Sequence, residues 1–162
     1  MDGYVLTVER TIRAAPEVIF AVLADPSKHS SIDGSGMVQG AAEADSQRLS
    51  LGATFGMSMK MGMHYSTTST VVEFEEGRRI AWQTGPKGKL ERFVAGRIWR
   101  YELEPRANGT LVRESWDIST DHQRALLKLG DIWSGKTRRD MELTLARLDS
   151  LVTAPVPGED AP

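Results

Sequence analysis

Cysteine is absent from this sequence of 162 residues, and its absence excludes a disulfide framework, a thiolate metal site and a cysteine nucleophile. A positive charge excess is missing too, because 20 Lys and Arg side chains stand against 22 Asp and Glu, for a net charge of −2. Without a basic field the chain has little with which to hold phosphates, so we expect no nucleic-acid partner. The lack of cysteine fits a reducing compartment, and we expect a cytoplasmic protein.

Long hydrophobic runs are also absent. No stretch approaches the ~20 apolar residues of a membrane-spanning helix, so we expect no membrane span. The segment Met1–Arg10 includes Asp2 and Glu9 and therefore does not resemble a secretory signal. Gly34, Gly36 and Gly40 follow no strand that leads into a βαβ unit, so we interpret them as a flexible lid and not as a nucleotide-binding loop.

The N-terminal part of the sequence predicts a strand followed by two short helices. Tyr4–Ile12 is rich in β-branched and aromatic residues, which favour strands. Pro16 suits the first turn of a helix whose apolar stripe continues to Leu23. A second cap-and-proline pair, Asp25–Pro26, predicts one or two further helical turns.

The middle of the sequence alternates with a period of two, which predicts antiparallel strands joined by short turns. We expect strands over residues 52–61, 66–74, 79–84, 96–104 and 110–119, with turns at Gly62 and 76–78 and loops at 85–89 and 105–109. With residues 4–12 these segments make six strands, and we allow for a seventh before Gly52.

The C-terminal part predicts a long helix. Residues 121–152 lack proline and are dense in Leu, Lys, Arg and Glu, with a candidate break at Ser134–Gly135. One face of this helix carries Met141, Leu145, Leu148 and Val152. Beyond Thr153 the prolines and acidic residues offer no apolar face, so we expect one domain over 1–153 and a disordered tail over 154–162.

The order of these elements, and the residues of Ile12–Pro26 in particular, resemble the START-like (SRPBCC) superfamily, most closely its polyketide cyclase/dehydrase-like branch. Arg79–Trp82, Arg100–Leu103 and Gly109–Val112 are also similar to strands of that family. The resemblance covers nearly the whole ordered chain. It implies an α+β helix-grip fold, in which a curved antiparallel sheet of about seven strands wraps around a long C-terminal helix and leaves a cavity. It implies no single activity, because the family includes aromatase/cyclases, lipid and hormone carriers and chaperone cofactors.

Alternation assigns an inward face to each strand of the predicted sheet. In 96–104 the inward set includes Trp99 and Tyr101, and in 110–119 it includes Glu114. If the hairpin closes near Gly109, Tyr101 lies opposite Glu114, with Arg97 several residues further along. The candidate ligand-binding residues are the inward aromatic, methionine and polar side chains Phe55, Met57, Met59, Trp82, Arg97, Trp99, Tyr101, Glu114 and Trp116.

These inward residues have two interpretations. The aromatic and methionine side chains either fill the core or line an apolar pocket of adaptable shape. Arg97 and Glu114 are either a structural ion pair at the cavity end or placed polar groups. In the second case Glu114 is an acceptor or proton shuttle, and Arg97 is a donor to a carbonyl or oxyanion.

The three histidines show no metal-binding spacing. We therefore expect no metal and no cofactor. We expect His29, His64 and His122 on the surface or in turns, with His29 and His64 near the pocket mouth.

Three functional hypotheses follow from these residues and from the resemblance. In the first, the chain binds a small hydrophobic metabolite, aromatic, polyketide-like or lipid-like, in an internal cavity. In the second it is a cyclase, aromatase or dehydratase in which Arg97, Tyr101 and Glu114 manage protons, although no recognisable catalytic motif specifies a reaction. In the third it is a protein-interaction module without a ligand. The oligomeric state stays open, a homodimer included.

Overall fold

The structure is a computed structural model that describes residues 3–41, 47–61, 63–86 and 96–154. Within these residues, seven strands form one antiparallel sheet in the order β1-β7-β6-β5-β4-β3-β2. The strands are β1 (Val5–Ile12), β2 (Val38–Ala41), β3 (Thr54–Met61), β4 (Met63–Glu75), β5 (Arg79–Pro86), β6 (Arg97–Arg106) and β7 (Gly109–Asp117).

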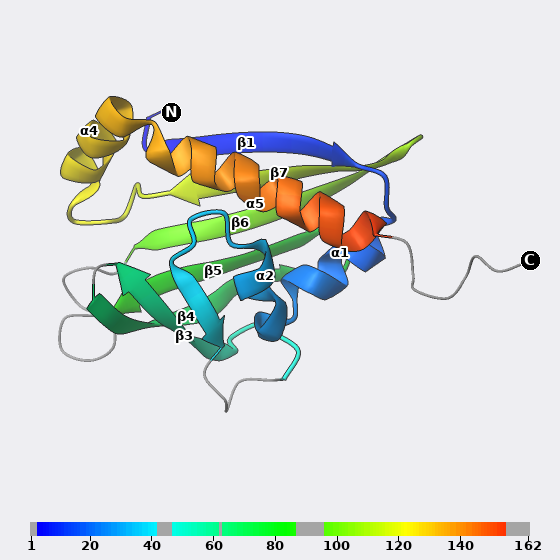
Figure 1. The fold of residues 1–162 in the computed structure, drawn as a ribbon, viewed down its shortest axis with the longest axis horizontal. Helices are drawn as coiled ribbons and strands as arrows, with labels where there is room; N and C mark the ends of the chain where they lie inside the picture. Colours follow the sequence, from blue (N-terminus) through cyan, green and yellow to red (C-terminus); the bar gives the residue numbers. More distant parts are fainter. Residues whose placement is uncertain (1–2, 42–46, 62, 87–95, 155–162) are drawn as a thin grey trace, which may run out of the picture.

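Helices cover one face of this sheet (Figure 1). The long helix α5 (Lys136–Thr153) runs across the concave face. The short helices α1 (Pro16–Leu23) and α2 (His29–Ile32) both contact α5, and α4 (Arg124–Ser134) precedes α5 in the chain. This arrangement confirms the predicted α+β helix-grip fold. None of the described helices is long and apolar enough to cross a membrane.

The ends of these helices follow from local chemistry. Ala15 is extended, with φ −67° and ψ 148°, and α1 begins at Pro16, whose missing N–H costs nothing in the first turn. A 3₁₀ turn spans Pro26–Lys28. The Asp25 carboxylate caps this turn by accepting a hydrogen bond of 3.0 Å from the Ser27 N–H. This cap holds the chain where α2 begins.

The predicted break in the C-terminal helix is confirmed at Gly135. This residue has a φ of 55°, a left-handed conformation that glycine adopts without strain. It ends α4, and α5 begins at the next residue. The buried Asp131 accepts the Thr137 N–H at 3.2 Å, which ties the two helices together.

The finer sequence predictions have different outcomes in the structure. The seventh strand before Gly52 is present as β2. Strand β5 continues to Pro86, where we expected a loop to have begun at Gly85. The predicted turn at Gly62, the loop residues 87–89 and residues 155–162 of the predicted tail lie outside the described residues.

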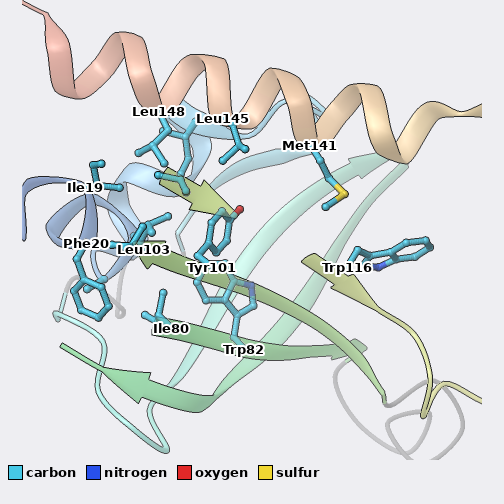
Figure 2. Close-up of a cluster of buried hydrophobic side chains, with 14 of the residues drawn as sticks. Ile19, Phe20, Ile80, Trp82, Tyr101, Leu103, Trp116, Met141, Leu145 and Leu148 are labelled. Carbon is cyan, nitrogen blue, oxygen red and sulfur yellow. The ribbon is translucent and has the colours of Figure 1, made fainter. Parts of the chain in front are cut away.

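The core lies between the concave face of the sheet and its helices (Figure 2). Met141, Leu145 and Leu148 of α5 are buried, as the predicted helical face requires. They join Ile19 of α1 and Leu103 of β6 in one hydrophobic cluster. Burial of this cluster is the principal favourable contribution to folding.

The other face of the sheet carries ion pairs. Arg100 of β6 binds Glu73 of β4 through Nε and Nη2, the latter at 2.6 Å from Oε1. Arg79 of β5 reaches Glu102 of β6 at 3.3 Å. Since Arg100 and Glu102 lie on this face, the neighbouring residue Tyr101 must point inward, which confirms the alternation predicted for the strand.

Candidate functional site

The centre of the candidate site is a pair of residues on adjacent strands. Tyr101 of β6 lies directly opposite Glu114 of β7, which confirms the predicted register. The Tyr101 hydroxyl donates a hydrogen bond of 2.9 Å to Glu114 Oε1. Tyr101 is 5% exposed and Glu114 only 2%. Glu114 Oε2 is buried and makes no hydrogen bond to any described residue.

Burial changes the acid–base chemistry of this pair. Loss of solvation raises the pKa of Glu114 to about 8. The hydrogen bond from Tyr101 opposes this rise, whereas the negative charge of Asp33 adds to it. Burial, followed by the Glu114 charge, raises the pKa of Tyr101 well above its ordinary value. Near neutral pH the pair therefore holds a proton that it can donate.

A series of aromatic rings leads away from the Tyr101 side chain. The Trp82 ring lies 5.4 Å from Tyr101, and the Phe55 ring lies 5.7 Å from Trp82 in an edge-to-face arrangement. Figure 2 shows Trp82 beside Tyr101, whose hydroxyl points toward α5. The structure thus brings Phe55, Trp82, Tyr101 and Glu114 of the predicted set together.

His29 also belongs to this cluster, and our prediction of a surface or turn histidine was wrong. It is 5% exposed, and its ring stacks on Trp82 with centroids 5.0 Å apart. Its Nε2 lies 2.9 Å from the Leu23 carbonyl oxygen, to which an Nε2–H donates. Burial lowers the pKa of His29, so the ring is neutral at physiological pH. The Asp25 cap was a sequence signal for the turn, but a four-residue helix has too few residues for a face to be predicted.

A second group of predicted residues lies toward the start of α5. Trp99 of β6 faces Trp116 of β7, with ring centroids 6.0 Å apart, and Figure 2 shows Trp116 below Met141. Trp116 is buried and Trp99 is half-buried. Met57 is buried on β3, while the side chain of Met59 on the same strand lies outside the described ones.

Arg97 is not the partner of Glu114. Its Nε donates to Asp121 Oδ2 at 2.8 Å, and that carboxylate is fully buried while Arg97 is 30% exposed. Asp121 also accepts the Gln123 N–H at 2.6 Å, which fixes the turn before α4. Of the two interpretations of Arg97 and Glu114, the structural ion pair between them is therefore wrong, because the Asp121 carboxylate beyond the end of β7 takes the guanidinium.

A row of hydroxyls on the concave face was missed. Thr67 and Ser69 of β4 and Thr84 of β5 share this face with Phe55 and Trp82 in the strand register. Ser69 and Thr84 hydrogen-bond to each other at 2.8 Å, and the buried Thr67 Oγ1 has no partner among the described residues. The unbroken run of Ser and Thr over residues 66–70 was the available signal, because alternate members of such a run must face inward.

The glycine-rich segment does not form the expected lid at Gly34. This residue is buried, and its N–H donates to Thr144 Oγ1 of α5 at 2.9 Å. A Cβ there would lie 2.7 Å from the Thr144 backbone nitrogen. Arg147 of α5 also donates to the Asp33 carbonyl oxygen. The segment after α2 is thus held against α5.

Two surface hollows lie away from the candidate residues. The larger, about 740 Å³, lies between residues 13–16 and the β6–β7 turn and is lined by Arg13, Ala14, Ala15, Pro16, Pro105, Arg106, Asn108 and Gly109. The smaller, about 180 Å³, lies on the face that carries the ion pairs. The described residues contain no group of three or more side chains arranged to hold a metal ion. Neither of the two hollows is lined by Glu114.

The chain is similar to a protein family and to curated relatives. A family model described as polyketide cyclase / dehydrase and lipid transport matches residues 5–153. The uncharacterized protein Rv0088 of Mycobacterium tuberculosis is 32% identical over 127 residues, which cover 76% of this chain and 51% of the relative. The chain thus spans about half the length of the curated relatives it matches.

Solved structures show the same fold. The crystal structure of protein Ms6760 from Mycobacterium smegmatis matches with a TM-score of 0.70 at 17% identity, covering 94% of this chain and 93% of that one. A solution structure of a protein from Arthrobacter aurescens matches with a TM-score of 0.69 at 12% identity, covering 99% and 94%.

Proposed function

The chain belongs to the polyketide cyclase / dehydrase and lipid transport family, and from this premise we propose that it binds a small hydrophobic molecule between α5 and the concave face of the sheet. The binding unit is residues 1–153, the single domain predicted from the sequence. The molecule is aromatic, polyketide-like or lipid-like, as the ring-lined interior suggests.

The observation that carries this proposal is the unpaired oxygen of Glu114. A buried polar atom without a hydrogen bond costs about 1–3 kcal/mol relative to one that is paired. Glu114 Oε2 is such an atom, and Tyr101, which donates to the other oxygen of this carboxyl group, packs its ring against Trp82. A ligand that packs against the rings and hydrogen-bonds to Oε2 removes this cost. Trp82 and Phe55 then supply apolar contact, while Trp99 and Trp116 extend the contact surface toward the start of α5.

The test is direct binding to the full chain. Native mass spectrometry of freshly purified protein, followed by a library of aromatic compounds and lipids, should show one-to-one complexes. Titrations followed by tryptophan fluorescence then give dissociation constants. Trp82→Phe, which keeps an aromatic ring but shortens the contact, should weaken binding by roughly 3–10-fold.

The matched control is Glu102→Gln. Glu102 lies on the other face of β6, where it pairs with Arg79. This change should leave the dissociation constants unaltered. If no compound in the library binds more tightly than about 1 mM, the proposal is wrong.

A second candidate function, catalysis of cyclisation or dehydration, is favoured by one observation. A carboxyl group with a pKa of about 8 that accepts a hydrogen bond from a tyrosine can exchange a proton with a bound substrate near neutral pH. Glu114 would be the proton donor, and Tyr101 would hold it in place. A poly-β-keto substrate incubated with the protein would then lose water, and Glu114→Gln would stop this loss while retaining binding.

A further inference from the structure

We propose that the carboxyl group of Glu114 donates a hydrogen bond to a carbonyl oxygen of the ligand, and that the site thereby selects neutral carbonyl compounds over carboxylates. This inference rests on the proposed binding function and adds to it the class of polar group that the ligand must carry.

The two oxygens of Glu114 have different surroundings. Oε1 already accepts the Tyr101 hydroxyl at 2.9 Å. Oε2 is buried and has no hydrogen-bond partner among the described residues. A proton on the carboxyl group is therefore placed on Oε2, because Oε1 serves as acceptor. The resulting O–H requires an acceptor, which a ligand carbonyl oxygen supplies.

No described cation is bound to this carboxyl group. On β6, Arg97 is paired with Asp121, and on β1 Arg10 is paired with Asp149 of α5. The residue opposite Glu114 on β1 is the apolar Val8. A carboxyl that is 2% exposed and lacks a paired cation is more stable in its neutral form.

The remaining charged groups around the site reinforce this preference. Asp33, which follows α2, raises the pKa of Glu114 by its negative charge. Its carboxylate is held by the Ser35 hydroxyl at 2.8 Å and by the Val38 N–H at 2.9 Å. On α5, Arg147 donates to the Asp33 carbonyl oxygen, and Asp140 pairs with Lys136.

These charges disfavour an anionic ligand. Burial lowers the pKa of His29 on α2, so this ring adds no positive charge to the cluster near neutral pH. A ligand carboxylate placed at Oε2 would meet the field of Asp33 and would itself lose its hydration. A ketone oxygen meets a hydrogen-bond donor at the same position without carrying a charge into the interior.

Four probes with one ring system separate the alternatives: 2-acetylnaphthalene, naphthalene, 2-naphthoate and 2-naphthylmethylamine. Each is titrated into the full chain at pH 6.5, with tryptophan fluorescence as the signal. The ketone should bind at least 10-fold more tightly than naphthalene and than the carboxylate. Infrared spectra of the bound ketone should show its carbonyl stretch at lower frequency than in an apolar solvent, as hydrogen bonding requires.

The pH dependence identifies the donor. If only the protonated carboxyl group binds the ketone, raising the pH from 6.5 to 9.5 should weaken binding ~30-fold, because little of the protonated form remains. Naphthalene binding should be unchanged over the same range.

Substitution of Glu114 separates its hydrogen bond to the ligand carbonyl from its packing against the ligand. Glu114→Gln keeps an acceptor for Tyr101 and presents an N–H in place of the O–H, so its ketone affinity should no longer depend on pH. Glu114→Met, without a donor, should bind the ketone and naphthalene equally. Glu102→Gln on the outer face should behave as the parent protein does.

The outcomes distinguish the two proposals. If the four probes bind with equal affinity, or if the amine binds most tightly, the role assigned to Glu114 is wrong while the binding function stands. If none of the probes binds, the binding function itself is contradicted for this ring class. Should the Glu114 variants fail to fold, the infrared shift and its loss at pH 9.5 in the parent protein still decide the question.

Discussion

The imidazole of His29 stacks on the indole of Trp82, with ring centroids 5.0 Å apart and ring planes inclined by 21°. The stack joins α2 to the middle of β5, and Phe55 of β3 contacts both rings edge-on. A titratable ring is thereby part of the hydrophobic core. Two pH-dependent groups, His29 and Glu114, lie on either side of the Trp82 and Tyr101 rings.

His29 should make the protein less stable as the pH falls. Its pKa is lowered by burial, so the unfolded chain takes up a proton on this side chain before the folded chain does. The stabilising contribution of the neutral ring is complete above the unfolded pKa of about 6.5 and is lost as the pH falls below it. His29→Gln, whose amide can donate to the Leu23 carbonyl without titrating, should remove this loss.

The measurement is urea unfolding of both proteins between pH 8 and pH 5. The free energy of unfolding of the parent should decline relative to that of His29→Gln as the pH is lowered. His122→Gln, on an exposed position before α4, is the control and should follow the parent. Parallel pH profiles for the parent and His29→Gln would show that folding does not lower the pKa of His29.

The tryptophans should differ in their contributions to stability. Trp82 is 6% exposed and packs against three other rings, so Trp82→Ala should cost about 3–5 kcal/mol. Trp99 is half-buried, and Trp99→Ala should cost less. Arg100→Ala removes an ion pair with Glu73 on the outer face and should cost no more than about 1 kcal/mol. Thermal unfolding of the three variants gives the order, and a larger loss at Arg100 than at Trp99 would contradict the assignment of faces.

Substitution of glycine by alanine should lower the stability of the protein at Gly34 and raise it at Gly130. Gly34→Ala places a methyl group against the backbone of Asp140 and Thr144, so it should push the segment after α2 away from α5 and lower the melting temperature. Gly130 lies within α4 with open space around it, so Gly130→Ala should stabilise the chain by about 0.5–1 kcal/mol. Differential scanning calorimetry of both variants tests this. An unaltered melting temperature for Gly34→Ala would mean that the α2 segment does not pack as described.

A chain that ends at Ala154 should be as stable as the full sequence. The last described contact of α5 is the hydrogen bond of 2.7 Å from the Thr153 hydroxyl to the Asp149 carbonyl, and Ala154 is exposed. Truncation after residue 154 therefore removes none of the contacts described here. The two proteins should melt at the same temperature, and a loss of several degrees would place part of the fold beyond this point.

The sheet and its inward face could be predicted because both depend on local patterns. Alternation in β6 and β7, with the turn at 105–109, was enough to pair Tyr101 with Glu114. The strand before Gly52 was harder to predict because it has only four residues, too few for a clear period. Gly135 was predicted as a helix break because its conformational freedom is a property of the residue itself.

The partners of individual side chains could not be predicted in the same way. Arg97 lies 24 residues before Asp121, and their contact depends on how the chain turns after β7. His29 of α2 is buried because its ring stacks on Trp82 of the sheet. The four residues of α2 are too few to show a periodicity that would predict this burial. Such contacts result from the packing of elements, whereas alternation reports only the face on which a residue lies.

Glu114 should make the parent protein less stable as the pH rises, opposite in sign to the effect of His29. Its pKa rises from 4.5 to about 8 on folding, so between these values the folded chain holds a proton that the unfolded chain has lost. Stability then falls with increasing pH across this window. Each pKa unit corresponds to about 1.4 kcal/mol, so the full loss is on the order of 5 kcal/mol.

Glu114→Gln isolates this contribution, because the amide cannot ionise and its carbonyl oxygen still accepts the Tyr101 hydroxyl. At pH 5 the variant should unfold at nearly the same denaturant concentration as the parent, since both are neutral at this position. At pH 9 the variant should be the more stable protein, because the parent must then hold a buried carboxylate without a paired cation among the described residues. Comparison of the two proteins at each pH cancels the contributions of His29 and of the surface carboxylates. A parent that stays as stable as the variant at pH 9 would show that Glu114 is ionised at little cost, which would also remove the basis for its role as a hydrogen-bond donor.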